Sequence, residues 1–192
     1  MLIHITKWPV IIFASPRTGS TVLGENIANT HNTLYYNEPN MRSDEMKKFV
    51  SNFELDNNFV LKIMAEMLEN DQYPKHIMEK MLSNKCFKIK LARKNIVEQI
   101  ASFYTCRNRK TWVYDEINRK HWDNTYIDIN HTEIEHSIKW VTYQNKLLDK
   151  VIADISLCYE DLPTIESTFK KTPRPTNYNE LISLISNSKI LS

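Results

Sequence analysis

A short segment near the N-terminus carries residues whose types suit anion binding. Residues 15–21 read Ser-Pro-Arg-Thr-Gly-Ser-Thr, so one guanidinium, at Arg17, lies among four hydroxyl groups. A guanidinium can donate two parallel hydrogen bonds to the oxygens of a phosphate or a sulfate. Average glycine usage of about 7% would give roughly a dozen glycines in such a chain, whereas this one has 2, Gly19 and Gly24, in or just after the segment. We therefore expect the backbone there to need a freedom that a Cβ would deny.

The segment lies between an expected strand and an expected helix. Residues 8–14 form a short apolar, β-branched run, which is typical of a buried strand in a parallel sheet. Ser20 or Thr21 can cap the helix that follows, and its apolar stripe comprises Val22, Leu23, Ile27 and Ala28. A loop between a strand and a helix presents backbone N–H groups and the positive end of the helix dipole to an anion. Phosphate or sulfate is the expected ligand.

Strands and helices alternate along the rest of the chain. Apolar or alternating runs predict strands at residues 33–36, 59–64, 86–91 and 155–159, and the run at 59–64 could instead open a helix through Leu68. In the third of these, Lys88 and Lys90 predict that one face is wetter than the other. Helices are expected from Pro74, from Asn95, from a capping box at residues 132–135 with apolar positions as far as Ile152, and from Asn177. This alternation predicts an α/β fold with a largely parallel sheet, in one domain spanning residues 1–192.

Composition excludes several classes of protein. The formal net charge is +2, without the concentrated basic excess of a general nucleic-acid binder. The 3 cysteines form no CxxC pair, which indicates neither a disulfide framework nor a zinc site and fits a reducing cytoplasm. The N-terminus lacks a signal-peptide pattern, and no window approaches a membrane span. We therefore expect a cytoplasmic protein with no nucleic-acid partner and no membrane span, of undetermined oligomeric state.

The loop differs from the version that binds nucleoside triphosphates, which reads G-x-x-x-x-G-K-[ST]. Aligning Gly19 with the second glycine of that motif puts Ala14 at the first glycine and Ser20 at the lysine. The lysine is therefore missing, and a cation occurs earlier, at Arg17.

This displaced arrangement resembles the 5′-phosphosulfate loop of the PAPS-dependent sulfotransferase family. Its bacterial and carbohydrate-acting branches read P-[RK]-[ST]-G-[ST]-T, and residues 16–21 here read Pro-Arg-Thr-Gly-Ser-Thr. The resemblance implies a three-layer α/β fold like that of P-loop nucleoside-triphosphate hydrolases, with a mostly parallel central sheet. It also implies 3′-phosphoadenylyl sulfate (PAPS) as donor, adenosine 3′,5′-bisphosphate as product and no required metal. The donor-binding residues of the loop would be Ser15, Pro16, Arg17, Thr18, Gly19, Ser20 and Thr21.

Two further segments resemble the family's phosphate contacts. The family's 3′-phosphate site combines an arginine at a strand end with a serine on the next helix, and Ser102 matches that serine. The usual spacing puts Lys94 at the arginine position, with Arg93 beside it, so either side chain could supply the charge. Lys171 and Arg174 lie in a stretch that resembles the family's basic C-terminal loop, and they are further candidates for phosphate contact.

Sulfuryl transfer to a hydroxyl needs in-line geometry, electrostatic support and a base for the acceptor proton. Carbohydrate-acting branches use a glutamate in a Glu-Pro context, which Glu38 and Pro39 match, so the resemblance implies Glu38 as the general base. Burial would raise the pKa of that carboxyl. Arg17 would support the transferring oxygens, Lys62 matches a strand lysine near the reacting sulfate, and His31 is the fallback base.

The acceptor and the alternatives remain open at this point. A hydroxyl-bearing small molecule or a glycan is expected as acceptor, and aromatic residues within residues 107–130 could stack on sugar rings. One alternative is a P-loop nucleotide kinase-like enzyme, which would share the fold and the anion loop. The other is a non-catalytic, nucleotide-binding protein of sulfotransferase-like fold.

Overall fold

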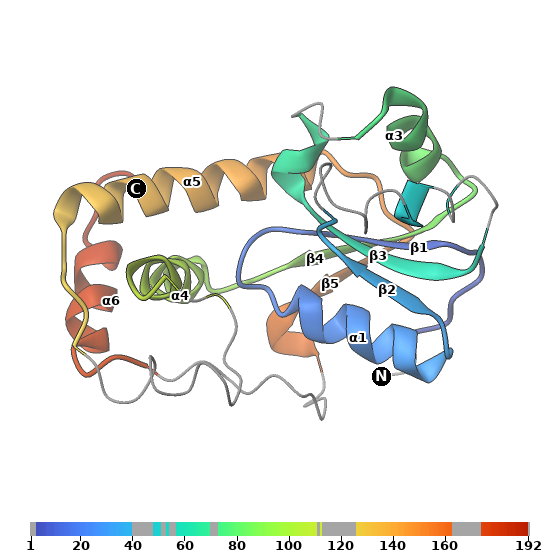
Figure 1. Cartoon of the computed structure of the whole chain (residues 1–192). Helices are drawn as coiled ribbons and strands as arrows, with labels where there is room; N and C mark the ends of the chain where they lie inside the picture. Colours follow the sequence, from blue (N-terminus) through green and yellow to red (C-terminus); the bar gives the residue numbers. More distant parts are fainter. Residues whose placement is uncertain are drawn as a thin grey trace. The chain divides into compact units, whose positions relative to one another are not determined.

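The computed structural model describes residues 3–39, 48–50, 53, 57–69, 73–110, 112, 126–162 and 174–191. In these ranges the chain is an α/β protein whose five-stranded sheet has the order β2-β3-β1-β4-β5 (Figure 1). The strands are β1 (Val10–Ala14), β2 (Leu34–Asn37), β3 (Phe59–Met64), β4 (Phe87–Ala92) and β5 (Ile155–Cys158). Each neighbouring pair is parallel, which confirms the expected parallel sheet.

The helices follow the strands in the expected alternation. They are α1 (Ser20–Thr30), the 3₁₀ helix η1 (Ala65–Leu68), α3 (Lys75–Leu82), α4 (Ile96–Asn108), α5 (His131–Asp149), the 3₁₀ helix η3 (Tyr159–Asp161) and α6 (Tyr178–Ser186). None of them, within the described ranges, is long and apolar enough to cross a membrane.

The chain divides into two compact units. The first comprises Met1–Ala92 and Gln144–Ile165, and it holds the whole sheet with α1 and α3. The second comprises Arg93–Tyr143 and Glu166–Ser192, and it holds α4, α6 and the first part of α5. The single domain over residues 1–192 stays a prediction.

In the first unit, all five residues of β1 are buried. Since successive side chains of a strand point to opposite sides of the sheet, both faces of the sheet are covered at β1. Ile12 belongs to an apolar cluster with Leu23 of α1, whereas Phe13 belongs to a second cluster with Ile77 and Met81 of α3. Helices therefore cover both faces of the sheet (Figure 1), as a three-layer α/β arrangement requires. Full burial stabilises the fold by about 1.5–3 kcal/mol for each such aliphatic or aromatic side chain.

In the second unit, α4, α5 and α6 contribute apolar side chains to one separate cluster. Ile100, Ile138 and Leu181 are fully buried in it, one from each helix. Asn177 precedes α6 as expected, but its side chain caps nothing and instead bonds the backbone of Ile127 in both directions. These two hydrogen bonds attach the start of α6 to the segment before α5.

Helix starts differ in part from the predictions. Gly19 is the N-cap of α1, so Ser20 is the first helical residue and neither it nor Thr21 caps the helix. The cap of α5 is Asn130, whose Oδ1 accepts a hydrogen bond from the N–H of Glu133 at 3.2 Å. The predicted box at residues 132–135 begins inside that helix, because a capping side chain must precede the first turn. The predicted Asn95 cap of α4 is confirmed, since its side chain accepts from Glu98 N–H.

One prediction about exposure holds only in part, and another is wrong. Lys88 on β4 is only 6% exposed, because its ammonium donates to the carbonyl of Leu82 at 2.9 Å and so has a buried partner. The expected wetter face of that strand is therefore covered at Lys88, whereas Lys90 on the same face is partly exposed, as predicted. Ile152 lies beyond the end of α5 and is 86% exposed, so it does not continue the apolar face of that helix.

Candidate anion-binding and catalytic residues

The predicted anion loop connects the carboxyl end of β1 to the start of α1. Ser15 and Thr18 are fully buried, and Thr18 Oγ1 donates a hydrogen bond to the Ser15 carbonyl at 3.0 Å. This bond closes the loop on itself. Ser20 is 5% exposed in the first helical turn, where backbone N–H groups lack intrahelical partners.

Both glycines have a structural reason, and the two reasons differ. Gly19 has a φ of 74°, and a Cβ there would lie 2.9 Å from Cδ2 of Tyr159. A Cβ on Gly24 would lie 2.3 Å from Cε2 of Tyr35. Gly19 therefore provides backbone freedom, as expected, whereas Gly24 provides space for a tyrosine of β2 to pack against α1.

Two predicted site residues also adopt left-handed backbone conformations. Arg17 has a φ of 62° and Glu38 a φ of 51°. Such conformations cost about 1–2 kcal/mol in a residue with a side chain, and they cluster at functional sites. The loop and the end of β2 thus hold their candidate residues in a backbone geometry that regular structure would not provide.

The loop lies at a position of the sheet where the topology favours ligand binding. β1 and β3 are adjacent and parallel, yet α1 packs on one face of the sheet and α3 on the other. In open α/β sheets, ligands bind at the carboxyl ends of neighbouring strands whose following helices lie on opposite faces. The loop after β1, the end of β3 and the end of β2 all lie at this edge.

Glu38 and Lys62 meet at this edge. β2 pairs with β3 as far as Asn37 opposite Lys62, and the Glu38 N–H donates to the Lys62 carbonyl at 2.9 Å. The Lys62 ammonium, whose side chain is 7% exposed, donates to Oε1 of Glu38, whose side chain is 34% exposed. The structure therefore joins two of the three predicted catalytic residues in one ion pair.

The third predicted catalytic residue, Arg17, influences Lys62 through its charge. Burial lowers the pKa of the Lys62 ammonium to about 7, and the positive charge of Arg17 contributes to the shift. The ion pair with Glu38 opposes this shift, because a neighbouring carboxylate favours the charged ammonium. The charge of this buried lysine is thus set by the balance between burial, Arg17 and Glu38.

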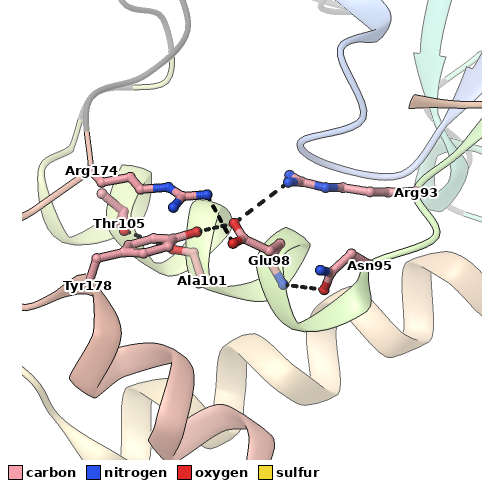
Figure 2. A network of polar contacts seen from close by, with 7 residues as sticks. All are labelled: Arg93, Asn95, Glu98, Ala101, Thr105, Arg174 and Tyr178. Carbon is pink, nitrogen blue, oxygen red and sulfur yellow. Dashed lines mark hydrogen bonds and ion pairs between the residues drawn. The ribbon is translucent and has the colours of Figure 1, made fainter. Parts of the chain in front are cut away.

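The second unit holds a separate cluster around the first turn of α4 (Figure 2). The carboxylate of Glu98 accepts a hydrogen bond from Arg174 Nη2 at 3.0 Å and one from the Tyr178 hydroxyl at 2.6 Å. Nη2 of Arg93 lies 3.8 Å from the same carboxylate. Two arginines predicted to contact phosphate, Arg93 and Arg174, therefore converge on one glutamate.

The other predicted donor contacts are less closely grouped. Lys94 is exposed just before α4, whereas Ser102 is half-buried within that helix. Lys171 lies outside the described residues. Arg93, Lys94, Ser102 and Arg174 all belong to the second unit, and their contact with a donor stays a prediction.

Sequence reasoning missed Glu98 and the hydroxyl of Tyr178. A signal for Glu98 was present, because an asparagine cap followed three residues later by glutamate is typical of a helix start. Nothing in the sequence linked Tyr178 to Glu98, because Tyr178 lies 80 residues further along the chain and reaches Glu98 only through the packing of α6 on α4.

Two other expectations concern the base and the acceptor. His31 is the C-cap of α1, and its ring lies edge-on to Trp8 at 5.4 Å between centroids. Within residues 107–130, Trp112 is 50% exposed, and its ring centroid lies 5.5 Å from that of Phe103. Most of that segment lies outside the described residues, so the acceptor stays a prediction.

Neither a metal site nor a match to a known protein helps to assign a function to these residues. Among the described residues, no three His, Cys, Asp or Glu side chains are grouped so as to hold a metal ion. Comparison with models of known protein families and with curated proteins gives no match for this chain.

Proposed function

We propose that this protein is a PAPS-dependent sulfotransferase that transfers the sulfuryl group of PAPS to an acceptor hydroxyl. The observation that carries the proposal is the position of the Glu38–Lys62 ion pair. It lies at the same edge of the sheet as the Arg17 loop, because Lys62 is on β3, the neighbour of β1, and Glu38 follows β2, the neighbour of β3. An anion loop, a carboxylate and a buried cation at one edge are the groups that the transfer needs.

Each group has a role in the transfer. Glu38 removes the proton of the acceptor hydroxyl, and the ion pair with Lys62 favours the ionised carboxylate that a base requires. The acceptor oxygen forms a bond to sulfur while the bond from sulfur to the 5′-phosphate oxygen breaks. The electron pair of that bond leaves with adenosine 3′,5′-bisphosphate. Arg17, the loop N–H groups and Lys62 support the charge on the transferring and leaving oxygens.

The far end of the donor would be bound by the second group of cations. We propose Arg93 or Lys94, together with Ser102, as the 3′-phosphate contacts, with Lys171 and Arg174 from the C-terminal loop. An arginine can bind a phosphate with two parallel hydrogen bonds, which a lysine cannot. Arg93 is half-buried and Lys94 is exposed, which favours Arg93.

Three finer aspects of the proposal, the fold family, the acceptor and the compartment, each have their own support. The P-loop nucleoside-triphosphate hydrolase-like fold is supported by the central position of β1 and by the glycine-capped helix after its loop. A glycan or glycolipid acceptor is supported only by the resemblance of the Glu38 segment to carbohydrate-acting branches. The cytoplasm is proposed because the 3 cysteines form no disulfide-framework pattern.

Sulfate transfer tests this function. The full chain is incubated with PAPS labelled in the sulfuryl group and a panel of sugars, glycolipids and small alcohols, with and without Mg²⁺. The proposal expects labelled acceptor without added metal. Phosphate transfer from Mg²⁺–ATP would support the kinase-like alternative, and tight bisphosphate binding without transfer to any acceptor would support the non-catalytic alternative.

A further inference from the structure

We infer that Glu98 is a positioning residue that holds Arg174, together with Arg93, for binding the 3′-phosphate of the donor. The inference rests on the proposed function and concerns a residue to which the resemblance assigns no role. It is carried by the cluster in the second unit, where one carboxylate contacts two guanidinium groups and a tyrosine hydroxyl (Figure 2).

Glu98 itself is fixed from two sides. Its backbone N–H donates to Oδ1 of Asn95 at 3.0 Å, which places it in the first turn of α4. Its Oε2 accepts from the hydroxyl of Tyr178 on α6, which is buried. Burial raises the pKa of Tyr178, and the Glu98 carboxylate adds to the shift, so this hydroxyl stays protonated and donates. The carboxylate therefore has a defined position independent of either arginine.

Arg174 is an exposed residue that this carboxylate holds in place. Its side chain is 56% exposed, yet its Nη2 bonds Oε1 of Glu98, and its Cζ lies 4.7 Å from the centre of the Tyr178 ring. Ordering an exposed arginine on ligand binding costs side-chain entropy. Contacts that already fix the guanidinium reduce that cost, which is how preorganisation increases affinity.

The charge balance of the cluster still favours an anion. Two guanidinium groups and one carboxylate leave a net positive charge, and a guanidinium carries five N–H donors. Without the carboxylate, Arg93 and Arg174 would repel each other on approaching the same phosphate. Glu98 thus holds the two cations close together while leaving a surplus of charge for a phosphate dianion.

Calorimetric titration of the full chain with two nucleotides tests this role. Adenosine 3′,5′-bisphosphate carries the 3′-phosphate, and adenosine 5′-phosphate lacks it. For Glu98→Gln, which keeps the shape and removes the charge, we expect about tenfold weaker binding of the bisphosphate, with the affinity for the 5′-phosphate changed less than twofold. Glu180→Gln, which removes an exposed carboxylate from the first turn of α6, is the matched control and should change neither affinity.

A second variant keeps the test decisive if Glu98→Gln unfolds. Tyr178→Phe retains the ring beside Arg174 and removes only the hydroxyl that fixes Glu98, and about threefold weaker bisphosphate binding is expected. Unchanged or tighter bisphosphate binding in the folded variants would overturn the positioning role, as would equal weakening for both nucleotides. If the unmodified protein bound neither nucleotide, the proposed function itself would fail, and the positioning role with it.

Discussion

Lys62 and Glu38 form an ion pair at the carboxyl ends of two adjacent parallel strands, β3 and β2. The same two residues also share a backbone hydrogen bond, in which the Glu38 N–H donates to the Lys62 carbonyl at 2.9 Å. The pair brings a carboxylate that could accept a proton beside an ammonium that could support a sulfate oxygen.

Replacing Glu38 by glutamine removes the proposed base and keeps its shape. Transfer should fall by roughly 10²–10⁴-fold, the usual contribution of general base catalysis, while the affinity for adenosine 3′,5′-bisphosphate stays within about twofold. Labelled-sulfate kinetics and calorimetry measure the two quantities separately. Transfer that survives the substitution intact would remove Glu38 from the mechanism.

Replacing Lys62 by methionine should change how stability depends on pH. The Lys62 pKa is lowered to about 7 in the folded chain from 10.5 for an ordinary lysine. Between these values the unfolded chain binds more protons than the folded one, so this residue makes the free energy of unfolding rise with pH. The rise is at most about 1.4 kcal/mol per pH unit.

Urea unfolding at pH 7, 8, 9 and 10 measures this effect as the difference between the unmodified protein and Lys62→Met. The difference should grow in favour of the unmodified protein as pH rises. Lys85→Met removes an exposed lysine of the same unit and should leave the pH dependence unaltered. A difference that is flat over this range would show that Lys62 keeps its ordinary pKa.

Replacing Arg17 should weaken donor binding according to the geometry of the new side chain. Arg17→Ala should weaken adenosine 3′,5′-bisphosphate binding by about 10–100-fold, because a charged hydrogen bond contributes about 1.5–3 kcal/mol. Arg17→Lys should recover only part of this loss, since an ammonium lacks the two-pronged geometry. Equal affinities for Arg17→Ala and the unmodified protein would contradict the assignment of the loop.

Replacing Gly24 by alanine should lower the stability of the unmodified protein but raise the stability of the Tyr35→Ala variant. In the unmodified protein the new Cβ meets the Tyr35 ring at 2.3 Å, and overpacking of this kind costs about 1–3 kcal/mol. With Tyr35→Ala the clash is gone, and alanine should stabilise the helix by about 0.5–1 kcal/mol relative to glycine. Urea unfolding of the four proteins completes the double-mutant cycle, and additive effects would contradict the packing described for this glycine.

The central strands β1, β3 and β4 were predictable because their burial leaves a direct mark on the sequence. All five residues of β1 are buried, so the strand reads as an unbroken apolar run that ends at the loop. β3 was predicted for the same reason, whereas β2, of which only Tyr36 is buried, was predicted from its short apolar run alone. The order of the strands in the sheet was not predictable, because pairing depends on contacts between distant segments. The anion-binding loop could be predicted because Arg17 and Gly19 lie in one short motif.

Long-range contacts explain what could not be predicted. Glu38 and Lys62 were each named from separate motifs, but their ion pair depends on the register of two strands 24 residues apart. The buried position of Lys88 depends on the carbonyl of Leu82, which no pattern of residue types reveals. Gly24 was attributed to backbone freedom, whereas the structure shows that it makes room for Tyr35.

Calorimetric titration of the full chain with adenosine 3′,5′-bisphosphate and with Mg²⁺–ATP tests the proposed donor most directly. The loop has Ser20 where triphosphate-binding loops have lysine. The proposal therefore predicts that the bisphosphate binds at least tenfold more tightly than ATP, with no requirement for Mg²⁺. Tighter, Mg²⁺-dependent binding of ATP would contradict it.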